Sequence, residues 1–241
     1  MEKVARLSPG ERGDLFSETA AKMGTTNEQA QIYIGGELLT RVATVIDGVC
    51  SCNIDSDDPH VINIRYPGAF PDDYLRSEVR LEIGPLASWL PYEERTISCY
   101  AAEEFPLVFE KRECSVKVIK AERTFWEKAT ILHHEAHRPD GNPLPSRYSR
   151  HYYDLAKMSG AAVKDAALAD LALLANVVEF KQRFYPRGWA QYELAKPGTL
   201  RLIPRGHVLA TVEVDYRAMV NMIFGEIPDF SEIMRIRNHV Q

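Results

Sequence analysis

The sequence has 241 residues, of which 45% are apolar and 26% charged, and its formal net charge is −5. These values are typical of a globular protein with one large domain or two small ones, long enough to bury a substantial core. The negative net charge excludes a globally basic nucleic-acid-binding protein but leaves room for a local basic patch.

We expect neither a membrane span nor a signal peptide. Every apolar run is far shorter than the roughly 18 residues that cross a membrane. The first residues, Met-Glu-Lys-Val-Ala-Arg, lack the apolar segment of a secretory signal. The four cysteines, Cys50, Cys52, Cys99 and Cys114, show no zinc-binding spacing. The sequence therefore predicts a cytoplasmic protein with reduced thiols.

The first half of the chain combines helices with short strands. A helix is predicted at 8–22, where Ser8, Pro9 and Glu11 fit an N-cap and a first turn. A second helix is predicted at 28–46, interrupted by Gly35-Gly36. Segments rich in β-branched residues and bounded by Asp, Pro or Gly predict strands at 49–54, 61–66, 79–83, 96–100 and 116–119. The segment 53–59 between the first two is typical of a hairpin turn.

The second half is helical. Helices are predicted at 122–137, 146–158, 163–183, 214–224 and 230–240. The order of elements predicts an α+β fold, with a small mixed sheet followed by a helical C-terminal half. We place the two predicted domains at 1–120 and 121–241.

The helix predicted at 122–137 has an apolar stripe with a lysine at its edge. Phe125, Ala129, Leu132 and Ala136 recur at spacings of four, three and four residues. Lys128 lies about 40–60° from this stripe at 100° per residue, so its stem can cover the core while its ammonium group faces a groove.

The next helix carries two arginines and an aspartate on one predicted face. Arg147, Arg150 and Asp154 stand at positions i, i+3 and i+7. Together with Lys128, these groups could hold a triphosphate. The alternative is a surface helix on which Arg150 and Asp154 form an ordinary i,i+4 pair.

This block resembles the C-terminal signature of the AbiEii/AbiGii toxin family, which has a nucleotidyltransferase fold. Lys128 matches the lysine of one family helix. The second family motif, R-x-x-R-x-x-Y-D-L, is matched by Arg147, Arg150, Tyr153, Asp154 and Leu155. The likeness continues through 188–192, 197–204 and 215–219, and it covers most of 28–241 and, separately, 4–23.

The resemblance implies a bacterial toxin of an abortive-infection system. Such a toxin would transfer a nucleotide from a nucleoside triphosphate, with Mg²⁺, to an RNA such as tRNA or to a protein. A cognate antitoxin with a winged-helix DNA-binding region would neutralise it. The resemblance implies catalytic roles for Lys128 and Asp154, nucleotide binding by Lys128, Arg147 and Arg150, and metal binding by Glu82 on the strand predicted at 79–83. The alternative for Glu82 is an ordinary solvent-facing acid on that strand.

The family's first motif, a Gly-Gly-Ser/Thr turn before a strand with two aspartates, is not found. Ile34-Gly35-Gly36-Glu37 is similar to the turn, and Asp55-Ser56-Asp57 to the pair of carboxylates. However, polar Ser56 separates these aspartates and Pro59 follows them, which indicates a turn rather than a strand. The resemblance therefore implies that a segment is missing near 25–27, and that the chain is either a working enzyme or a non-catalytic binding remnant.

A weaker alternative is a metallohydrolase. His133 and His137 have the i,i+4 spacing of two zinc ligands. The zincin pattern H-E-x-x-H, however, needs glutamate where this chain has His134. We therefore expect solvent-facing or supporting histidines here.

Overall fold

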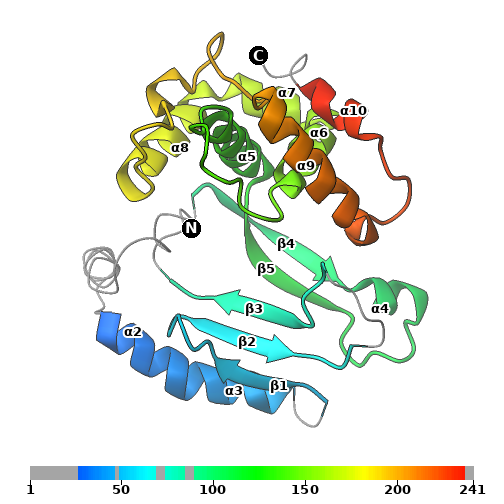
Figure 1. Cartoon of the computed structure of the whole chain (residues 1–241). Helices are drawn as coiled ribbons and strands as arrows, with labels where there is room; N and C mark the ends of the chain where they lie inside the picture. The colour runs from blue at the N-terminus through cyan, green and yellow to red at the C-terminus, as the bar shows by residue number, and fades with distance from the viewer. Residues whose placement is uncertain (1–26, 47–48, 69–73, 85–89, 237–241) are drawn as a thin grey trace. The chain divides into compact units, whose positions relative to one another are not determined.

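The computed structural model describes residues 27–46, 49–68, 74–84 and 90–236 (Figure 1). The helix predicted at 8–22 and the missing segment inferred near 25–27 fall outside these ranges, apart from residue 27. The chain divides into two compact units, Met1–Ser88 and Trp89–Gln241. Compactness does not test independent folding, so the domain boundary at residue 120 stays a prediction.

The first unit contains a three-stranded antiparallel sheet and one interrupted helix. Strands β1 (Ser51–Ile54), β2 (Val61–Arg65) and β3 (Glu78–Glu82) pair in the order β1-β2-β3. The central strand holds the most buried side chains of this sheet, Val61 and Ile62. The β1–β2 connection is the hairpin predicted from the sequence, with Ser51 opposite Arg65.

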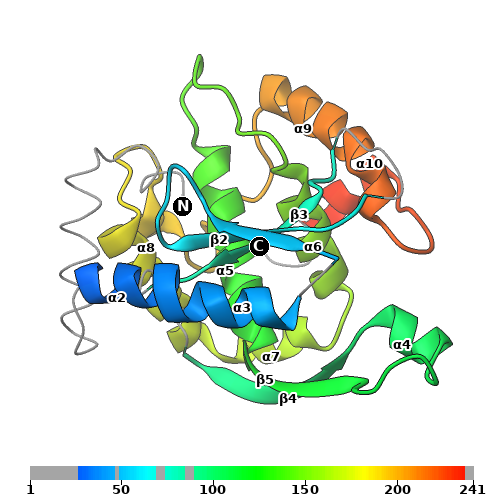
Figure 2. The same cartoon turned by 90° about the horizontal axis from the view of Figure 1, so that it is seen from below.

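The helix predicted at 28–46 is confirmed (Figure 2). It consists of three consecutive segments: α2 (Asn27–Tyr33), a π-helical turn (Ile34–Leu38) and α3 (Leu39–Val45). Gly35 and Gly36 lie inside the π turn. They are thus part of a helix and do not form a catalytic Gly-Gly turn before a strand.

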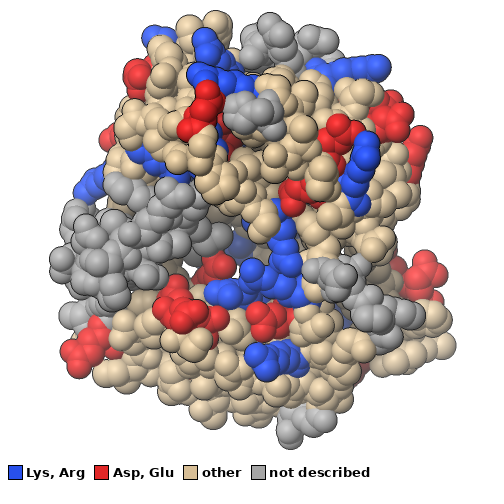
Figure 3. Space-filling view, viewed as in Figure 1, with Lys and Arg blue, Asp and Glu red and all other residues tan. Residues whose placement is uncertain are grey.

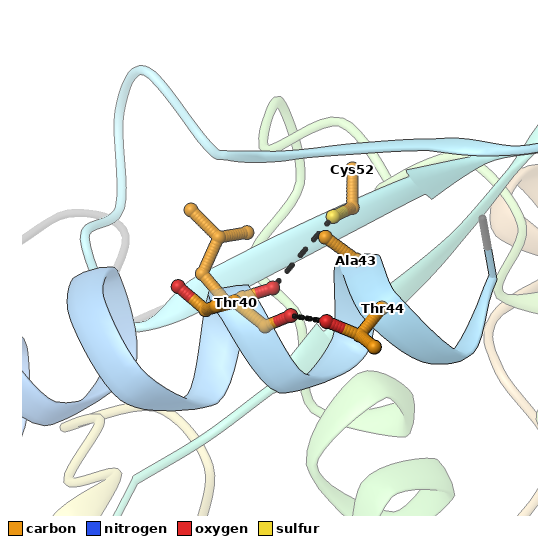
Figure 4. Close-up of a pocket in the computed structure, with 5 residues that line it drawn as sticks. Thr40, Ala43, Thr44 and Cys52 are labelled. Carbon is orange, nitrogen blue, oxygen red and sulfur yellow. Dashed lines mark hydrogen bonds between the residues drawn. The ribbon is translucent and has the colours of Figure 1, made fainter. Parts of the chain in front are cut away.

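An open pocket of about 510 Å³ lies between α3 and β1, lined by Leu39, Thr40, Ala43, Thr44 and Cys52 (Figure 4). The Thr44 hydroxyl donates to the Thr40 carbonyl at 2.9 Å, and the Thr40 hydroxyl donates to the Gly36 carbonyl at 2.8 Å. Because both hydroxyls are used inside their own helix, the pocket offers a ligand mainly methyl groups, and we assign it no role.

The second unit begins with a hairpin. Strands β4 (Tyr92–Ser98) and β5 (Glu113–Ile119) pair antiparallel, and α4 (Tyr100–Glu104) lies in their connection. The α+β class is confirmed, but the described strands form two antiparallel sheets in place of the single mixed sheet expected. Both sheets are built from strands that follow one another along the chain, and such neighbours pair antiparallel, whereas parallel pairs need crossover connections.

Helices make up the rest of the second unit. Figure 1 shows α5 in the middle of this group, where it packs against α6, α7 and α8. The bounds are α5 Ala121–Ala136, α6 Ser149–Ser159, α7 Val163–Ala169, α8 Leu171–Phe184, α9 Gly206–Ala218 and α10 Phe230–Ile233. Short 3₁₀ turns occupy Tyr192–Leu194, Val220–Met222 and Met234–Ile236.

Three predicted helices differ from the structure. The helix predicted at 230–240 is the short α10 followed by the 3₁₀ turn Met234–Ile236, and its last residues lie outside the described ranges. The helix predicted at 163–183 is broken at Asp170, whose carboxylate accepts a hydrogen bond from the Leu173 N–H at 3.0 Å and caps α8. The helix predicted at 214–224 begins earlier as α9. Its buried stripe, Val208, Val212 and Tyr216, was already present in the sequence at four-residue spacing.

Candidate functional site

Lys128 and Asp154 meet between α5 and α6. The Lys128 Nζ lies 2.7 Å from the Asp154 Oδ2, and the two side chains are 20% and 37% exposed. These fractions mean that solvent and small ions reach the pair. The predicted apolar stripe of α5 is confirmed, with Phe125, Ala129 and Leu132 fully buried and Lys128 at its edge.

His151, one turn before Asp154 on α6, accepts a second hydrogen bond from Lys128, at 3.1 Å between Nζ and Nδ1. An ammonium group only donates, so this geometry requires a bare Nδ1 and a proton on Nε2. Burial, together with the nearby charges of Lys128 and Arg150, lowers the pKa of His151 to about 2. Lys128 is therefore held by one anionic and one neutral acceptor, which leaves its third N–H bond for a ligand.

The start of α6 is fixed by Asp215 of α9. Its Oδ1 accepts the Arg147 N–H at 2.8 Å, and its Oδ2 accepts both the N–H and the hydroxyl of Ser149 at 2.8 and 2.7 Å. A carboxylate at this point satisfies free N–H groups and matches the positive end of the helix. Asp215 thereby sets the position of α6 and of the His151 and Asp154 side chains on it.

Two of the predicted nucleotide-binding residues differ from the expected arrangement. Arg147 lies before α6 with φ 64°, in the left-handed region, so it does not share a helical face with Arg150 and Asp154. Arg150 is exposed on α6 and close enough to lower the pKa of His151. Asp154 pairs with Lys128 from another helix and not with Arg150, so the ordinary i,i+4 pair is not formed.

Of the two expectations for the histidines of α5, solvent-facing or supporting, the structure agrees with the second, because His133 and His134 are buried in the core. The His133 Nδ1 accepts the Arg201 N–H at 2.9 Å, which leaves Nε2 to donate to the Gln191 carbonyl, also at 2.9 Å. Both ring nitrogens are thus engaged with backbone groups. This bonding argues against zinc binding by His133 and His137, and with it the metallohydrolase alternative.

On the same helix, Glu135 accepts two hydrogen bonds from the Arg138 guanidinium, at 2.5 and 2.7 Å, and both side chains are fully buried. The His134 Nε2 lies 2.6 Å from the same carboxylate. Burial by itself raises the pKa of Glu135, but these hydrogen bonds and charges bring it below its usual range. The network is buried within the helical unit, and its charged groups are hydrogen-bonded to one another.

Asp55 shows turn chemistry, as predicted. Its Oδ1 accepts the N–H groups of Asp57 and Asp58 at 3.0 and 3.2 Å, and its Oδ2 accepts the Asn63 amide at 2.8 Å. Hydrogen bonding from Asn63 and Asp57 lowers the pKa of Asp55. Oδ1 thus serves the turn, and Oδ2, which also lies 3.3 Å from the Arg80 guanidinium, ties the turn to β2 and β3.

Glu82 lies on β3 with its side chain 46% exposed, 3.9 Å from the Arg80 guanidinium. It belongs to the first unit, whereas Lys128 and Asp154 belong to the second. Its role as a metal ligand stays a prediction. Within the described ranges, no three histidine, cysteine or acidic side chains gather as a metal site.

The surface shows mixed charge. Lys and Arg side chains are interspersed with Asp and Glu over the face in view in Figure 3. In the described part of the chain, no helix is long and apolar enough to cross a membrane. All four cysteines are free.

A family model described as the nucleotidyl transferase AbiEii toxin of type IV toxin–antitoxin systems matches residues 15–236. No curated protein and no solved structure matches the chain. The family match spans the β3 strand, the Lys128–Asp154 contact and Asp215, and it covers most of the sequence. The chain therefore belongs to the AbiEii nucleotidyl transferase toxin family.

Proposed function

We propose that the chain transfers a nucleotide from a nucleoside triphosphate to a hydroxyl group of an acceptor RNA, with tRNA as the first candidate, or of a protein. In this reaction an acceptor oxygen bonds to the α-phosphorus and pyrophosphate leaves. The observation that carries the proposal is the Lys128 ammonium group, held by Asp154 and His151 with one N–H bond left for a phosphate oxygen.

The residues have distinct proposed roles. Lys128 neutralises the developing negative charge, and Asp154 orients Lys128 or the acceptor. Exposed Arg150 and the nearby Arg147 contact the triphosphate, since guanidinium groups bind phosphates in a bidentate manner. Phosphoryl chemistry of this kind depends mainly on positioning and charge neutralisation.

Mg²⁺ is the proposed cofactor, together with Glu82 as its predicted ligand. The cytoplasm is the proposed compartment. The type IV toxin–antitoxin system of the family implies a cognate antitoxin as partner.

The runner-up is a binding remnant without turnover. It is favoured by the lack of a three-donor metal cluster among the described residues. Lys128, Arg147 and Arg150 supply charge, but they do not align the attacking hydroxyl and the leaving pyrophosphate as a carboxylate-held metal does. Losing such a site costs at least about 3–4 kcal/mol of transition-state stabilisation, or more than about a hundredfold in rate.

The test is incubation of purified protein with labelled nucleoside triphosphates, Mg²⁺ and total tRNA. Lys128→Ala is the test variant, and Lys164→Ala, whose lysine pairs with Asp165 on α7, is the matched control. Label transfer that persists in the control and disappears in Lys128→Ala supports the enzyme. Triphosphate binding without any transfer supports the binding remnant. Transfer that is unaffected by Lys128→Ala contradicts both hypotheses, the transferase that uses Lys128 and the remnant without turnover.

A further inference from the structure

Lys181 is a half-buried lysine that continues the buried stripe of α8. It follows Leu174 and Val177 at spacings of seven and four residues, and these two side chains are 3% and 0% exposed. Apart from an approach of its Nζ to 5.6 Å from the Tyr185 ring centre, Lys181 makes no hydrogen bond or ion pair with the described part of the chain. An ammonium group has three donors, and leaving them unsatisfied in an apolar setting is costly.

The surroundings of Lys181 are cationic. Burial is the first cause that lowers the pKa of Lys181 to about 8. The pKa of Lys181 is also lowered by the positive charges of Arg123 and Lys128 on α5 and of Arg187 after α8, and it is raised by the carboxylate of Glu127.

Glu127 already has a partner. Its Oε1 accepts a hydrogen bond from the Arg123 Nε at 3.0 Å. Arg123 is itself buried, and it lies over the ring of Phe180, the residue next to Lys181. Its Nη2 has no hydrogen-bond partner among the described residues. Lys128 is likewise paired with Asp154, so the carboxylates of Glu127 and Asp154 balance Arg123 and Lys128 and leave the charge of Lys181 without a carboxylate of its own in the described part of the chain.

The helix that carries Lys181, α8, packs against α5, which carries Lys128, and the Arg123 guanidinium of α5 lies 5.8 Å from the ring centre of Phe180 on α8. The charges of Lys128 and Lys181 both lower the pKa of His151, whose imidazole accepts a hydrogen bond from Lys128. A partly buried group of positive charges with too few carboxylates is stabilised by a bound anion, whose oxygens satisfy the open N–H donors.

We propose that Lys181 and Lys128 together form a subsite for a polyphosphate anion, with the buried Arg123 guanidinium group adding positive charge. The identity of the natural anion rests on the proposed function. It would be the triphosphate of the nucleotide substrate or the pyrophosphate that leaves. The binding itself needs no turnover.

Calorimetric titration of the full chain with inorganic tripolyphosphate, without Mg²⁺, tests this subsite at pH 7. Lys181→Met is expected to weaken binding at least tenfold, because the ammonium group is lost while the length of the side chain is kept. Lys164→Met, which removes a partly exposed lysine of α7, is the matched control and should stay within twofold of the wild type. Equal affinity in Lys181→Met and wild type overturns the proposal.

A second measurement works on the wild-type protein and does not depend on a variant that folds. Lysine labelled with carbon-13 at Cε reports each ammonium group by nuclear magnetic resonance. The Lys181 signal is recognised by its titration midpoint, expected near 8, where an ordinary lysine titrates near 10.4. Saturating tripolyphosphate should move this midpoint upward by at least one pH unit, and an unchanged midpoint with the anion bound overturns the proposal.

The two hypotheses fail separately. If tripolyphosphate binds and moves the Lys181 midpoint, but no nucleotide is transferred from any triphosphate, the subsite stands and the transferase proposal falls. If nucleotide transfer proceeds and the Lys181 midpoint does not respond to the anion, the transferase proposal stands and the subsite falls.

Discussion

At the scale of single residues, Lys128 is held by two acceptors that affect it differently. Asp154 supplies a negative charge at 2.7 Å, whereas His151 supplies a neutral lone pair at 3.1 Å. The second contact fixes the direction of the ammonium group without neutralising it. His151 is therefore a positioning residue for Lys128 in the proposed site.

Replacing His151 by Leu should weaken tripolyphosphate binding by about tenfold. A hydrogen bond to a charged group contributes about 1.5–3 kcal/mol, and a factor of ten corresponds to about 1.4 kcal/mol. His151→Gln keeps an acceptor near the same position and should stay within about threefold of the wild type. Calorimetric titration measures both variants, and equal losses in them would show that the acceptor is irrelevant and only the imidazole shape matters.

At the scale of elements, the start of α6 depends on a carboxylate from a different helix. Asp215 of α9 receives three hydrogen bonds, from Arg147 and Ser149. Tyr148, at the N-cap position of α6, provides no side-chain cap. The contact between α6 and α9 therefore replaces the local cap that most helices carry.

Asp215→Ala should lower the melting temperature by about 4–8 °C. Loss of a helix cap costs up to about 2 kcal/mol, and each kcal/mol shifts Tm by about 2–4 °C in a protein of this size. Glu213→Ala on the same helix is the control, because its pair with Arg217 is largely exposed and contributes little. Differential scanning calorimetry compares the two, and equal shifts would contradict the capping role.

The sequence predicted those features that depend on neighbours along the chain. The apolar stripe of α5 and the position of Lys128 at its edge follow from helical periodicity alone. The turn at Asp55 follows from short polar residues and a proline. The break at Asp170 was also readable, because Asp before Leu-Ala-Leu-Leu is a typical N-cap, but the continuous apolar pattern on both sides hid it.

Contacts between distant segments were not predictable in the same way. His151 meets Lys128 across two helices, and Asp215 lies 68 positions from Arg147 in sequence. No local pattern encodes such pairs. Lys181 is an intermediate case: a lysine at the i+4 position after Val177 breaks an apolar stripe, which is a signal that periodicity analysis can detect.

At the scale of the whole molecule, burial of histidines makes stability depend on pH. The pKa values of His60, His133, His134 and His151 are all lowered, in each case first by burial. The native state therefore resists protonation of these rings, whereas the unfolded chain takes up protons near pH 6.5. Stability is then present above about pH 6.5 and is lost as the pH falls below it.

His151 should account for about 1.4 kcal/mol of stability lost between pH 7.5 and 5.5, because its native pKa is about 2 and its unfolded pKa about 6.5. The lowered pKa values of Asp55 and Glu135 also make the protein less stable as the pH falls. Unfolded carboxyl groups take up protons only near pH 4, so the stability lost between pH 7.5 and 5.5 comes from the histidines. Urea unfolding at the two pH values measures the loss. His151→Gln should reduce the loss by about 1.4 kcal/mol, whereas Glu213→Ala should keep it in full. A pH dependence identical in His151→Gln and wild type would show that His151 is protonated in the native state, which its hydrogen bond from Lys128 forbids.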